Sequence, residues 1–401
     1  MRVLGLILGI LFVFYALLDA FQTVILPRRP SGALRLTSVF YQLTWTPWRF
    51  FACRLSRLRK RETVLSVYGP LSLVLLIGIW ALALILGFGM IYYALGSPFH
   101  DPMGRSVDSD FYVSGTTLFT LGLGDVMPDT WFVRFLMVVE SGLGLGFVAL
   151  VIGYFPVLYG AFSKREVNIS MLGGRAGSPP TAVELLCRHN FEGGLSVLFQ
   201  LLAQWELWSA ELLESHISYP LLCYFRSQHA QQSWLSSLVV ILDACALLIA
   251  GVEEKQARQA QLTFMMARHA LMDLSQIFVD RPELAGPERL SAEVFLKVHA
   301  RLTSAGFKVC ETEDTERRLK KLRGLYEPYA YWMGEYLCMT LPPFLGEGNE
   351  TSNWHSVSRV RAEAESRGGA ENRAQREKRG DREGVLGFER RHTSEDPNHI
   401  L

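Results

Sequence analysis

The chain has 401 residues, of which 49% are apolar and 20% charged, and its formal net charge is +1. This composition suits a protein with both membrane and soluble segments, and the near-neutral charge argues against a nucleic-acid partner. The cysteines are scattered and include no Cys-x-x-Cys pair, so we expect reduced thiols and no disulfide framework or metal site. They are Cys53, Cys187, Cys223, Cys245, Cys310 and Cys338.

The chain begins with a nearly unbroken apolar run over residues 3–18, which continues weakly to Pro27. A secretory signal peptide is the competing interpretation, but the start carries a single basic residue and no small-x-small cleavage site follows. We therefore predict a retained first transmembrane helix over residues 1–27. Asp19 near its end is costly in lipid, so we expect its carboxylate to face protein or lipid headgroups.

Residues 28–63 form a basic segment with interleaved aromatic residues, including Trp45 and Trp48. Nine basic side chains and no acidic one lie between positions 28 and 61, namely Arg28, Arg29, Arg35, Arg49, Arg54, Arg57, Arg59, Lys60 and Arg61. Such a segment fits the cytoplasmic surface of a membrane and contact with anionic lipid. The positive-inside rule explains this charge without nucleic acid.

Two further apolar runs, residues 71–95 and 131–162, are each long enough to cross a bilayer. The first follows the basic segment and the second ends at Lys164 and Arg165, so their basic ends should lie inside. The stretch between them holds five acidic residues against one arginine, a composition that concentrates cations at an outer mouth. We predict a pore domain over residues 64–162.

Residues 120–125 of that stretch read Thr-Leu-Gly-Leu-Gly-Asp. Glycine at alternate positions permits φ angles that are closed to other residues, so successive carbonyls can turn the same way. A row of carbonyls facing one axis can replace the water shell of a bare cation. Non-helical backbone at membrane depth is tolerated only where it is buried in protein or lines a wet cavity.

This hexapeptide resembles the filter of potassium channels, which usually reads Thr-Val-Gly-Tyr-Gly-Asp. Four positions match and two leucines replace the valine and the tyrosine. The matching residues are Thr120, Gly122, Gly124 and Asp125, and the replacements are Leu121 and Leu123. The resemblance covers roughly residues 65–165, and Glu140 falls where several members carry an acidic residue. Beyond the pore, the stretch Arg-Glu-Val-Asn-Ile-Ser from Arg165 and the helical tail resemble a bacterial subfamily with a single pore loop per chain.

The resemblance implies a homotetramer, because one loop cannot surround an ion. It also implies that main-chain carbonyls and one hydroxyl bind K⁺, while the last two residues shape and brace the outer end. The implied ligands are the carbonyls of Thr120, Leu121, Gly122 and Leu123 and the Thr120 hydroxyl, with Gly124 as the final flexible turn and Asp125 as the brace.

Three glycines, Gly142, Gly144 and Gly146, cluster in the third apolar run, and Pro156 lies near its inner end. Glycines let helices approach closely, and proline bends a helix. In the family that the pore resembles, such points act as gating hinges. Close packing explains the glycines equally well, so both interpretations stay open.

The rest of the chain has a different character. Residues 163–180 are predicted to be a linker, residues 181–345 a cytoplasmic helical domain, and residues 346–401 a disordered tail. Residues 235–251 are apolar enough to suggest a fourth span, but Asp243 in their middle favours a buried helix of a soluble bundle. The domain has no glycine-rich βαβ fingerprint, so no nucleotide-binding regulatory domain is assigned to it. Sensing of an unknown ligand and association of subunits both stay open as its role.

These patterns together predict an all-α membrane protein of the cell membrane. It has three transmembrane helices, a re-entrant pore helix and filter loop, a cytoplasmic helical domain and a disordered tail. The resemblance favours a potassium-selective ion channel. A weakly selective cation channel and a non-conducting membrane-tethered sensor or scaffold are the alternatives. The sequence contains no pattern of catalytic residues, so we expect no enzyme and no cofactor besides potassium ions in the pore.

Charge asymmetry also predicts the topology, with the N-terminus outside and the long C-terminal region inside. In a cysteine-free background, Ser106→Cys should react with an impermeant thiol reagent on intact cells, because it lies in the predicted outer loop. Ser178→Cys should react only after permeabilisation. Labelling of position 178 on intact cells, or of position 106 only after permeabilisation, would contradict this orientation.

Overall fold

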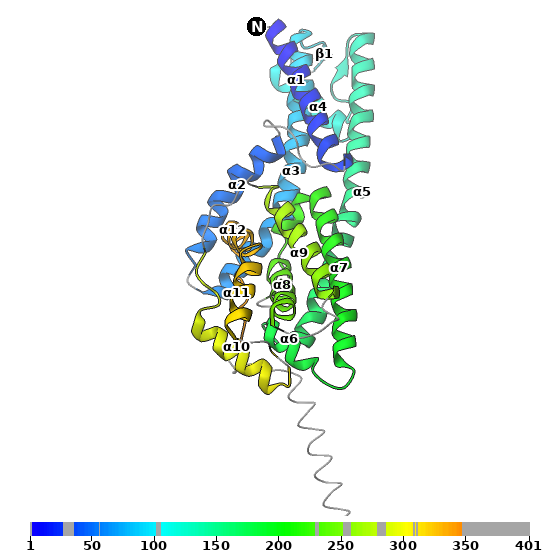
Figure 1. Ribbon diagram of the computed structural model, residues 1–401. Helices are drawn as coiled ribbons and strands as arrows, with labels where there is room; N and C mark the ends of the chain where they lie inside the picture. Colours follow the sequence, from blue (N-terminus) through cyan, green and yellow to red (C-terminus); the bar gives the residue numbers. More distant parts are fainter. Residues whose placement is uncertain are drawn as a thin grey trace, which may run out of the picture. The chain divides into compact units, whose positions relative to one another are not determined.

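A computed structural model describes most of the chain as helix (Figure 1). The described residues are 2–26, 36–55, 57–101, 106–228, 232–251, 258–278, 286–307, 309 and 312–346. The predicted disordered tail lies outside them from Glu347 onward, as do Arg28, Arg29 and Arg35 of the basic segment.

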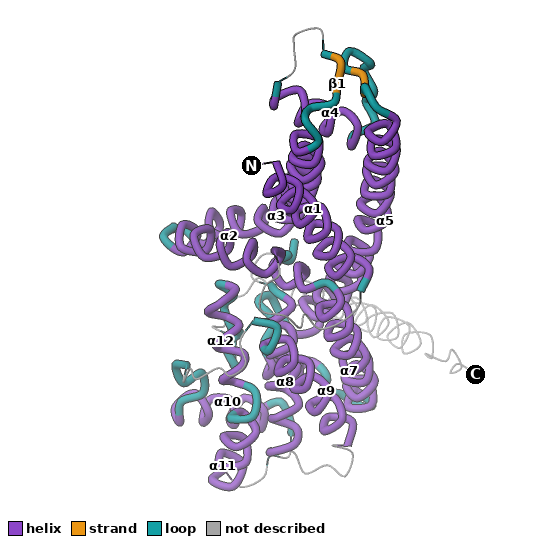
Figure 2. Tube along the Cα trace, turned by 90° about the horizontal axis from the view of Figure 1, so that it is seen from above, coloured by secondary structure: helices purple, strands orange, loops and turns teal. Residues whose placement is uncertain are grey.

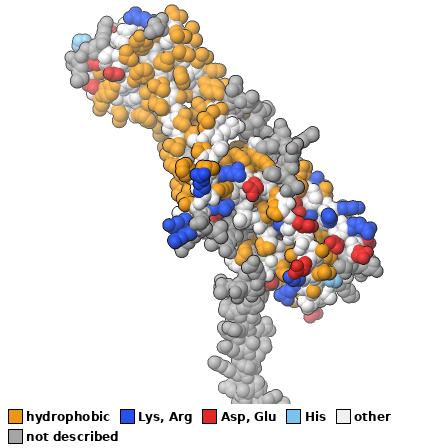
Figure 3. All heavy atoms as spheres, turned by 90° about the vertical axis from the view of Figure 1, so that its left-hand side faces the viewer, with side chains coloured by type: hydrophobic (Ala, Val, Ile, Leu, Met, Phe, Trp, Pro, Cys, Tyr) orange, Lys and Arg blue, Asp and Glu red, His pale blue; other side chains and the backbone are white. Residues whose placement is uncertain are grey.

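Three helices are long and apolar enough to cross a membrane and leave much of their surface open. They are α1 (Arg2–Ala20) with the π-helical turn η1 (Phe21–Ile25), α3 (Leu58–Ala94) and α5 (Trp131–Ala176). Their most apolar windows are only 28%, 50% and 17% buried, and apolar side chains such as Phe14, Val138 and Ile152 are exposed. Hydrophobic side chains accordingly cover most of the upper part of the face that Figure 3 shows. These helices fit a membrane protein.

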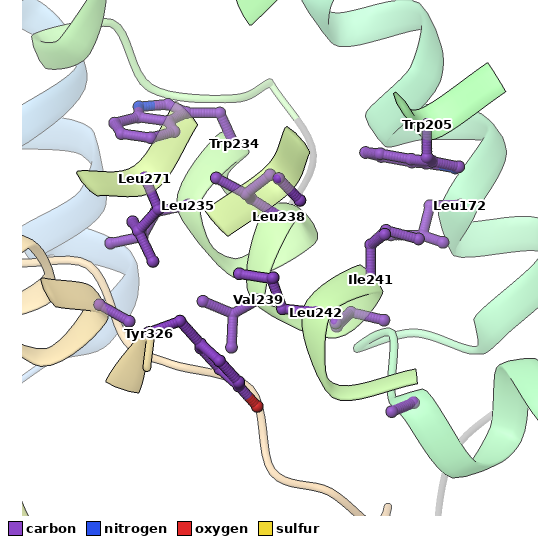
Figure 4. Packing of buried hydrophobic residues seen from close by; sticks show 14 of the residues in the cluster. Leu172, Trp205, Trp234, Leu235, Leu238, Val239, Ile241, Leu242, Leu271 and Tyr326 are labelled. Atoms are coloured by element: carbon purple, nitrogen blue, oxygen red, sulfur yellow. The ribbon is translucent and has the colours of Figure 1, made fainter. Parts of the chain in front are cut away.

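A fourth helix, α8 (Trp234–Gly251), has similar hydropathy, but 94% of it is buried within the described residues. Figure 4 shows Leu235, Leu238 and Ile241 of α8 among side chains from α5, α7 and α9. The structure thus buries this segment at the centre of a helical bundle, as the sequence predicts. Membrane-like hydropathy here reflects a helix enclosed by protein on all sides.

The bundle around α8 is built from six further helices and a short 3₁₀ turn. They are α6 (Ala182–Arg188), α7 (Gly194–Ser218), η2 (Pro220–Tyr224), α9 (Arg258–Ser275), α10 (Ala292–Ser304), α11 (Thr312–Arg323) and α12 (Glu327–Leu337). Thr181 caps the start of α6, since its hydroxyl accepts from the Glu184 N–H at 3.3 Å.

The basic segment contains α2 (Leu36–Cys53), which runs away from α1 in Figure 2. It packs on the first part of α3, where Thr44 hydrogen-bonds the Tyr68 hydroxyl at 2.9 Å and Trp48 Nε1 donates to the Val64 carbonyl at 3.1 Å. Two of its apolar residues, Leu43 and Phe51, are 69% and 70% exposed. Two basic residues of the segment turn toward the bundle instead of outward. Arg49 lies 3.8 Å from the Glu335 carboxylate, and Arg61 donates to a main-chain carbonyl of the bundle.

The linker predicted over residues 163–180 is wrong for most of its length, because α5 continues without a break to Ala176. Gly173 and Gly174 are helical despite their low propensity, which costs only about 1 kcal/mol per glycine. Burial of Ile169 and Leu172 in the bundle core outweighs that cost. The helix ends at Gly177, whose φ of +92° suits glycine.

Arg165 joins this extension of α5 to the bundle by hydrogen bonds. The sequence places it at the basic inner end of a span, but its side chain is 4% exposed within the bundle. It donates to the carbonyls of Leu222 at 2.9 Å and Phe225 at 3.0 Å, and its Nη1 lies 3.1 Å from His216 Nε2. Burial, and then the Arg165 charge, hold the pKa of His216 well below its usual range, so the neutral ring accepts this bond. Of the two basic residues, only Lys164 remains exposed.

One hydrophobic core therefore runs through the bundle and the adjoining ends of the long helices. Trp45 of α2, Leu65 of α3 and Leu158 of α5 belong to the same buried cluster as Leu198 and Leu238 of the bundle. Residues 163–180 do not separate two packing units. The ends of α2, α3 and α5 are parts of the bundle.

The bundle contains a buried ion-pair network whose disruption provides a test of this core. Asp243 is fully buried and accepts from Arg289 and Tyr326, and Arg289 also lies 3.1 Å from Glu327. Asp243→Ala leaves the buried Arg289 guanidinium undercompensated, so we expect a loss of about 3–5 kcal/mol in the free energy of unfolding. Denaturant titration of the detergent-solubilised protein, followed by tryptophan fluorescence, measures it.

The matched control is Glu293→Ala, which removes an exposed carboxylate paired with Lys297 at 2.6 Å. Solvent screens this pair, so the variant should unfold like the parent protein. Equal midpoints for Asp243→Ala and Glu293→Ala would contradict a structural role for the buried network.

Candidate functional site

The candidate site is the connection between α3 and α5, which lies at the far end of the molecule from the bundle (Figures 1 and 2). It contains α4 (Val107–Leu118), whose N-cap Ser106 accepts from the Ser109 N–H at 3.3 Å. Two short strands, β1 (Phe99–His100) and β2 (Met127–Pro128), pair antiparallel and join the two ends of the connection. This two-stranded ladder departs from the predicted all-α fold.

Residues 120–125 follow α4 directly and adopt an alternating backbone. The φ angles of Thr120, Gly122 and Gly124 are +57°, +55° and +76°, whereas Leu121 and Leu123 stay at negative φ. Positive φ at the two glycines is what the sequence predicts. A threonine with positive φ is uncommon and costs about 1–2 kcal/mol, a strain that often marks functional sites.

Main-chain hydrogen bonds attach the start of this segment to α4. The Thr120 N–H donates to the Thr117 carbonyl at 3.0 Å, and the Leu121 N–H donates to the Thr116 carbonyl at 2.8 Å. The rest of the segment is open within one chain. Leu121 and Leu123 are 62% and 64% exposed, and no described atom lies within 4 Å of where a Gly122 Cβ would stand.

Asp125 at the C-terminal end of the segment accepts a hydrogen bond from the Tyr112 hydroxyl at 2.8 Å. The sequence predicts that Asp125 braces this end of the segment, and Tyr112 of α4 is a donor in the structure. The sequence does not point to this partner, because a single exposed tyrosine on a short helix has no distinctive pattern. A carboxylate that is held in place nonetheless requires a hydrogen-bond donor nearby. Tyr112 could have been considered, because it lies on the helix directly before the segment.

A second carboxylate, Glu140 of α5, connects three helices behind the segment. Its Oε2 accepts from the Tyr92 hydroxyl of α3 at 2.7 Å, and its Oε1 accepts from the Ser114 hydroxyl of α4 at 2.5 Å. Ser114 also lies 3.1 Å from the Ile85 carbonyl of α3. Glu140 and Ser114 are fully buried and Tyr92 is too, so each hydrogen bond is shielded from water. Resemblance points to Glu140 in the sequence, but not to its two partners.

The hinge candidates occupy different surroundings on α5. A Cβ on Gly144 would lie 1.9 Å from the Leu118 carbonyl oxygen, so the last turn of α4 packs directly on this glycine. Positions 142 and 146 have no described atom within 4 Å of an added Cβ, and Pro156 lies inside an unbroken helix. Packing therefore explains Gly144 but not Gly142 or Gly146. A hinge at any of the four positions stays a prediction.

The other polar residue singled out in a span, Asp19, faces protein as expected. Its Oδ2 accepts from Trp80 Nε1 at 2.8 Å and from the Thr37 hydroxyl at 2.6 Å. The carboxylate thereby links α1, α2 and α3 where η1 begins. These contacts satisfy the charge without a direct role in the candidate site.

A cavity of about 200 Å³ lies close to Asp19, where η1, α2, α3, α5 and the bundle meet. Most of its polar lining comes from η1 and α2, and the remaining walls are apolar and aromatic apart from Ser218. The polar residues of η1 and α2 are Gln22, Thr23, Thr37, Ser38 and Gln42. None of the described lining residues is charged, so the cavity suits an uncharged group.

Comparisons with known proteins agree with this placement. A family profile described as "Ion channel" matches residues 80–158, which run from α3 through α4 and the candidate segment into α5. The Bacillus subtilis (strain 168) protein described as "Uncharacterized membrane protein YdjJ" is 25% identical over 317 residues, covering 72% of this chain and 90% of that protein. No solved structure matches. The matched region supports an ion-channel pore family, and the relative supports a membrane location.

The close contact at Gly144 predicts an effect that its neighbours should lack. Gly144→Ala places a methyl group against the Leu118 main chain, so the end of α4 must shift, at a cost of about 1–3 kcal/mol in the free energy of unfolding. Thermal unfolding of the detergent-solubilised protein, followed by circular dichroism, measures the loss.

Gly142→Ala and Gly146→Ala are the matched controls, because both positions are open within the chain. Alanine favours helix over glycine, so these variants should keep the parent stability or gain about 0.5–1 kcal/mol. A Gly144→Ala variant as stable as Gly146→Ala would show that the contact with Leu118 does not hold α4.

Proposed function

We propose that the protein is a potassium-selective ion channel and not an enzyme. The observation that carries this proposal is the alternation of φ at Thr120, Gly122 and Gly124, inside the region that matches an ion-channel family. Alternating backbone handedness can direct successive carbonyls to one side, as a row of cation ligands requires.

The proposed assembly is a homotetramer with one candidate segment from each chain around a common axis. A single chain offers one row of carbonyls and leaves Leu121 and Leu123 more than 60% exposed, at 62% and 64%. Four rows would enclose an ion, and neighbouring chains would cover part of the exposed apolar surface. Exposed apolar side chains on α5, such as Val138 and Ile152, would meet neighbouring chains or lipid.

In this assembly the main chain does the chemistry of ion binding. The ligands are the carbonyls of Thr120, Leu121, Gly122 and Leu123 and the Thr120 hydroxyl. The C-terminal end of α4, which carries a partial negative charge, is directed toward the segment and favours a cation there. Two hydrogen-bonded carboxylates hold the surroundings, Asp125 through Tyr112 and Glu140 through Ser114.

The proposed orientation places the N-terminus outside and the bundle in the cytoplasm, in the cell membrane. The bundle shares its core with the ends of α3 and α5, so a change within it would act directly on both pore helices. Bending at Gly142, Gly146 or Pro156 is the proposed alternative to rigid movement of α5. The uncharged cavity beside η1 is the candidate place for a bundle ligand.

A weakly selective cation channel is the second candidate, and Leu123 is the observation that favours it. A leucine side chain has no hydrogen-bond donor, and this one makes little contact within its own chain, at 64% exposed. One hydrogen bond is typically worth about 1 kcal/mol. Its loss therefore changes the equilibrium between the ordered and the loosened segment by less than tenfold per chain. The carbonyl ligands come from the main chain, which leucine supplies as well as tyrosine.

Bi-ionic reversal potentials of the purified protein in planar bilayers distinguish the two candidates. We expect potassium to be preferred over sodium, with a preference that weakens at low external potassium because the segment is loosely held. Equal permeability at every concentration would reject the potassium channel in favour of the weakly selective one. The absence of any current from a folded tetramer would support the non-conducting alternative.

Gly122→Ala is the variant that connects this current to residues 120–125. Its Cβ disfavours the observed φ of +55° by about 1 kcal/mol or more in each chain. Selective current should disappear while the tetramer persists on size-exclusion chromatography, because no described side chain packs on this glycine. An unchanged selective current would show that these glycines do not form the filter.

A further inference from the structure

One face of α2 docks along the end of α12. Three residues of α2 spaced four apart, Trp45, Arg49 and Cys53, make the contacts, and residues at this spacing share one helix face. Trp45 Nε1 donates to the Tyr336 carbonyl at 3.0 Å, and Arg49 lies 3.8 Å from the Glu335 carboxylate. At the end of this face, Cys53 Sγ lies 2.8 Å from Cys338 Sγ.

The main chain around Cys338 is held from two other directions. This residue caps the C-terminus of α12 with a φ of +52°. Its carbonyl accepts from Arg61 of α3 at 2.9 Å and from Arg226, which follows η2, at 3.3 Å. These charge-assisted bonds fix the position of one sulfur, and the docked face of α2 fixes the other.

The two thiols have unequal access to reagents. Cys53 is exposed, whereas Cys338 is 4% exposed, and burial and then the contact with Cys53 raise the pKa of Cys338 to about 11. Their sulfurs are within 1 Å of the S–S bond length of about 2.05 Å, so closure requires only a small movement. Cys187, Cys223 and Cys245 have no sulfur neighbour in the described part of the chain.

We propose that Cys53 and Cys338 form a redox modification site, in which a reversible disulfide joins α2 to the end of α12. The oxidant is a small-molecule disulfide. The Cys53 thiol loses its proton to solvent and attacks one sulfur of the oxidant, which releases one thiolate and forms a mixed disulfide. Cys338 then loses its proton and attacks Cys53 Sγ, which expels the second thiolate. The protein loses two electrons and two protons, and the two released thiolates take up protons to become thiols.

The disulfide has a local structural consequence that does not depend on ion conduction. Tyr41 of α2 and Tyr336 of α12 both line the cavity of about 200 Å³. A covalent bond between the two helices fixes these walls relative to each other. Reduction leaves the hydrogen bond of Trp45, its ring contact with Tyr336 at 6.4 Å between centroids, and the long Arg49–Glu335 pair along this face.

Peptide mapping of the purified full-length protein tests the proposal. After incubation with oxidised glutathione, quenching of free thiols and tryptic digestion, residues 50–54 should be linked to the peptide that contains Cys338. The linked pair should be lighter than the sum of the two reduced peptides by two hydrogens and should separate on treatment with dithiothreitol. The protein should keep the mobility of a single chain on a non-reducing denaturing gel, because both sulfurs belong to one chain.

Cys53→Ser should abolish the linked peptide, and Cys245→Ser should preserve it, since Cys245 is fully buried elsewhere in the bundle. Cys53 is exposed, so its serine variant should fold, and an unchanged thermal unfolding midpoint under reducing conditions checks this. Three outcomes would overturn the proposal. They are a stable glutathione adduct on Cys53 with free Cys338, a band of two chains on the non-reducing gel, or full alkylation of both thiols after oxidation.

Discussion

The contact between the last turn of α4 and α5 determines where residues 120–125 lie. Gly144 lets the Leu118 carbonyl approach α5 closely, and Glu140 holds Ser114 four residues earlier on α4. The segment that follows α4 has few contacts of its own within one chain, so its position derives from the helix before it. Non-helical backbone with few contacts of its own needs such support to keep one conformation.

The same helix that supports α4 also belongs to the bundle. Arg165 and Leu172 of α5 are buried there. At a rise of about 1.5 Å per residue, Leu172 lies about 40 Å along the helix from Gly144. The bundle is therefore not a separate module on a tether. Its core includes Tyr154 and Leu158, which lie on either side of Pro156.

The sequence predicts the parts of this protein that depend on local composition. Hydropathy predicts the long apolar helices, and the charged residue in the middle of α8 distinguishes a buried helix from a further span. Alternating glycines predict positive φ at Gly122 and Gly124. In each case the determinant is a property of consecutive residues, which needs no knowledge of distant neighbours.

What could not be predicted depends on contacts between distant residues. Gly173 and Gly174 suggest a linker by propensity, but the burial of Leu172 keeps them helical. Arg165 follows an apolar run, as basic residues at the end of a transmembrane helix do. In the structure, however, its guanidinium donates to carbonyls of η2 and of the loop that follows it. The partners of Asp125 and Glu140 come from other helices, and a single sequence gives no measure of which helix faces which.

The shared helix α5 also has a thermodynamic consequence. Leu150, Val151 and Tyr154 of α5 line the uncharged cavity, and Gly144 of the same helix supports α4. Suppose that a molecule in the cavity prefers one position of α5, and that this position also favours one conformation of residues 120–125. The molecule then shifts the equilibrium between conformations of residues 120–125 by some factor, and that conformation changes the affinity for the molecule by the same factor. A change in the conformation of residues 120–125 would then be measurable as a change in affinity at the cavity, even in a preparation through which no current flows.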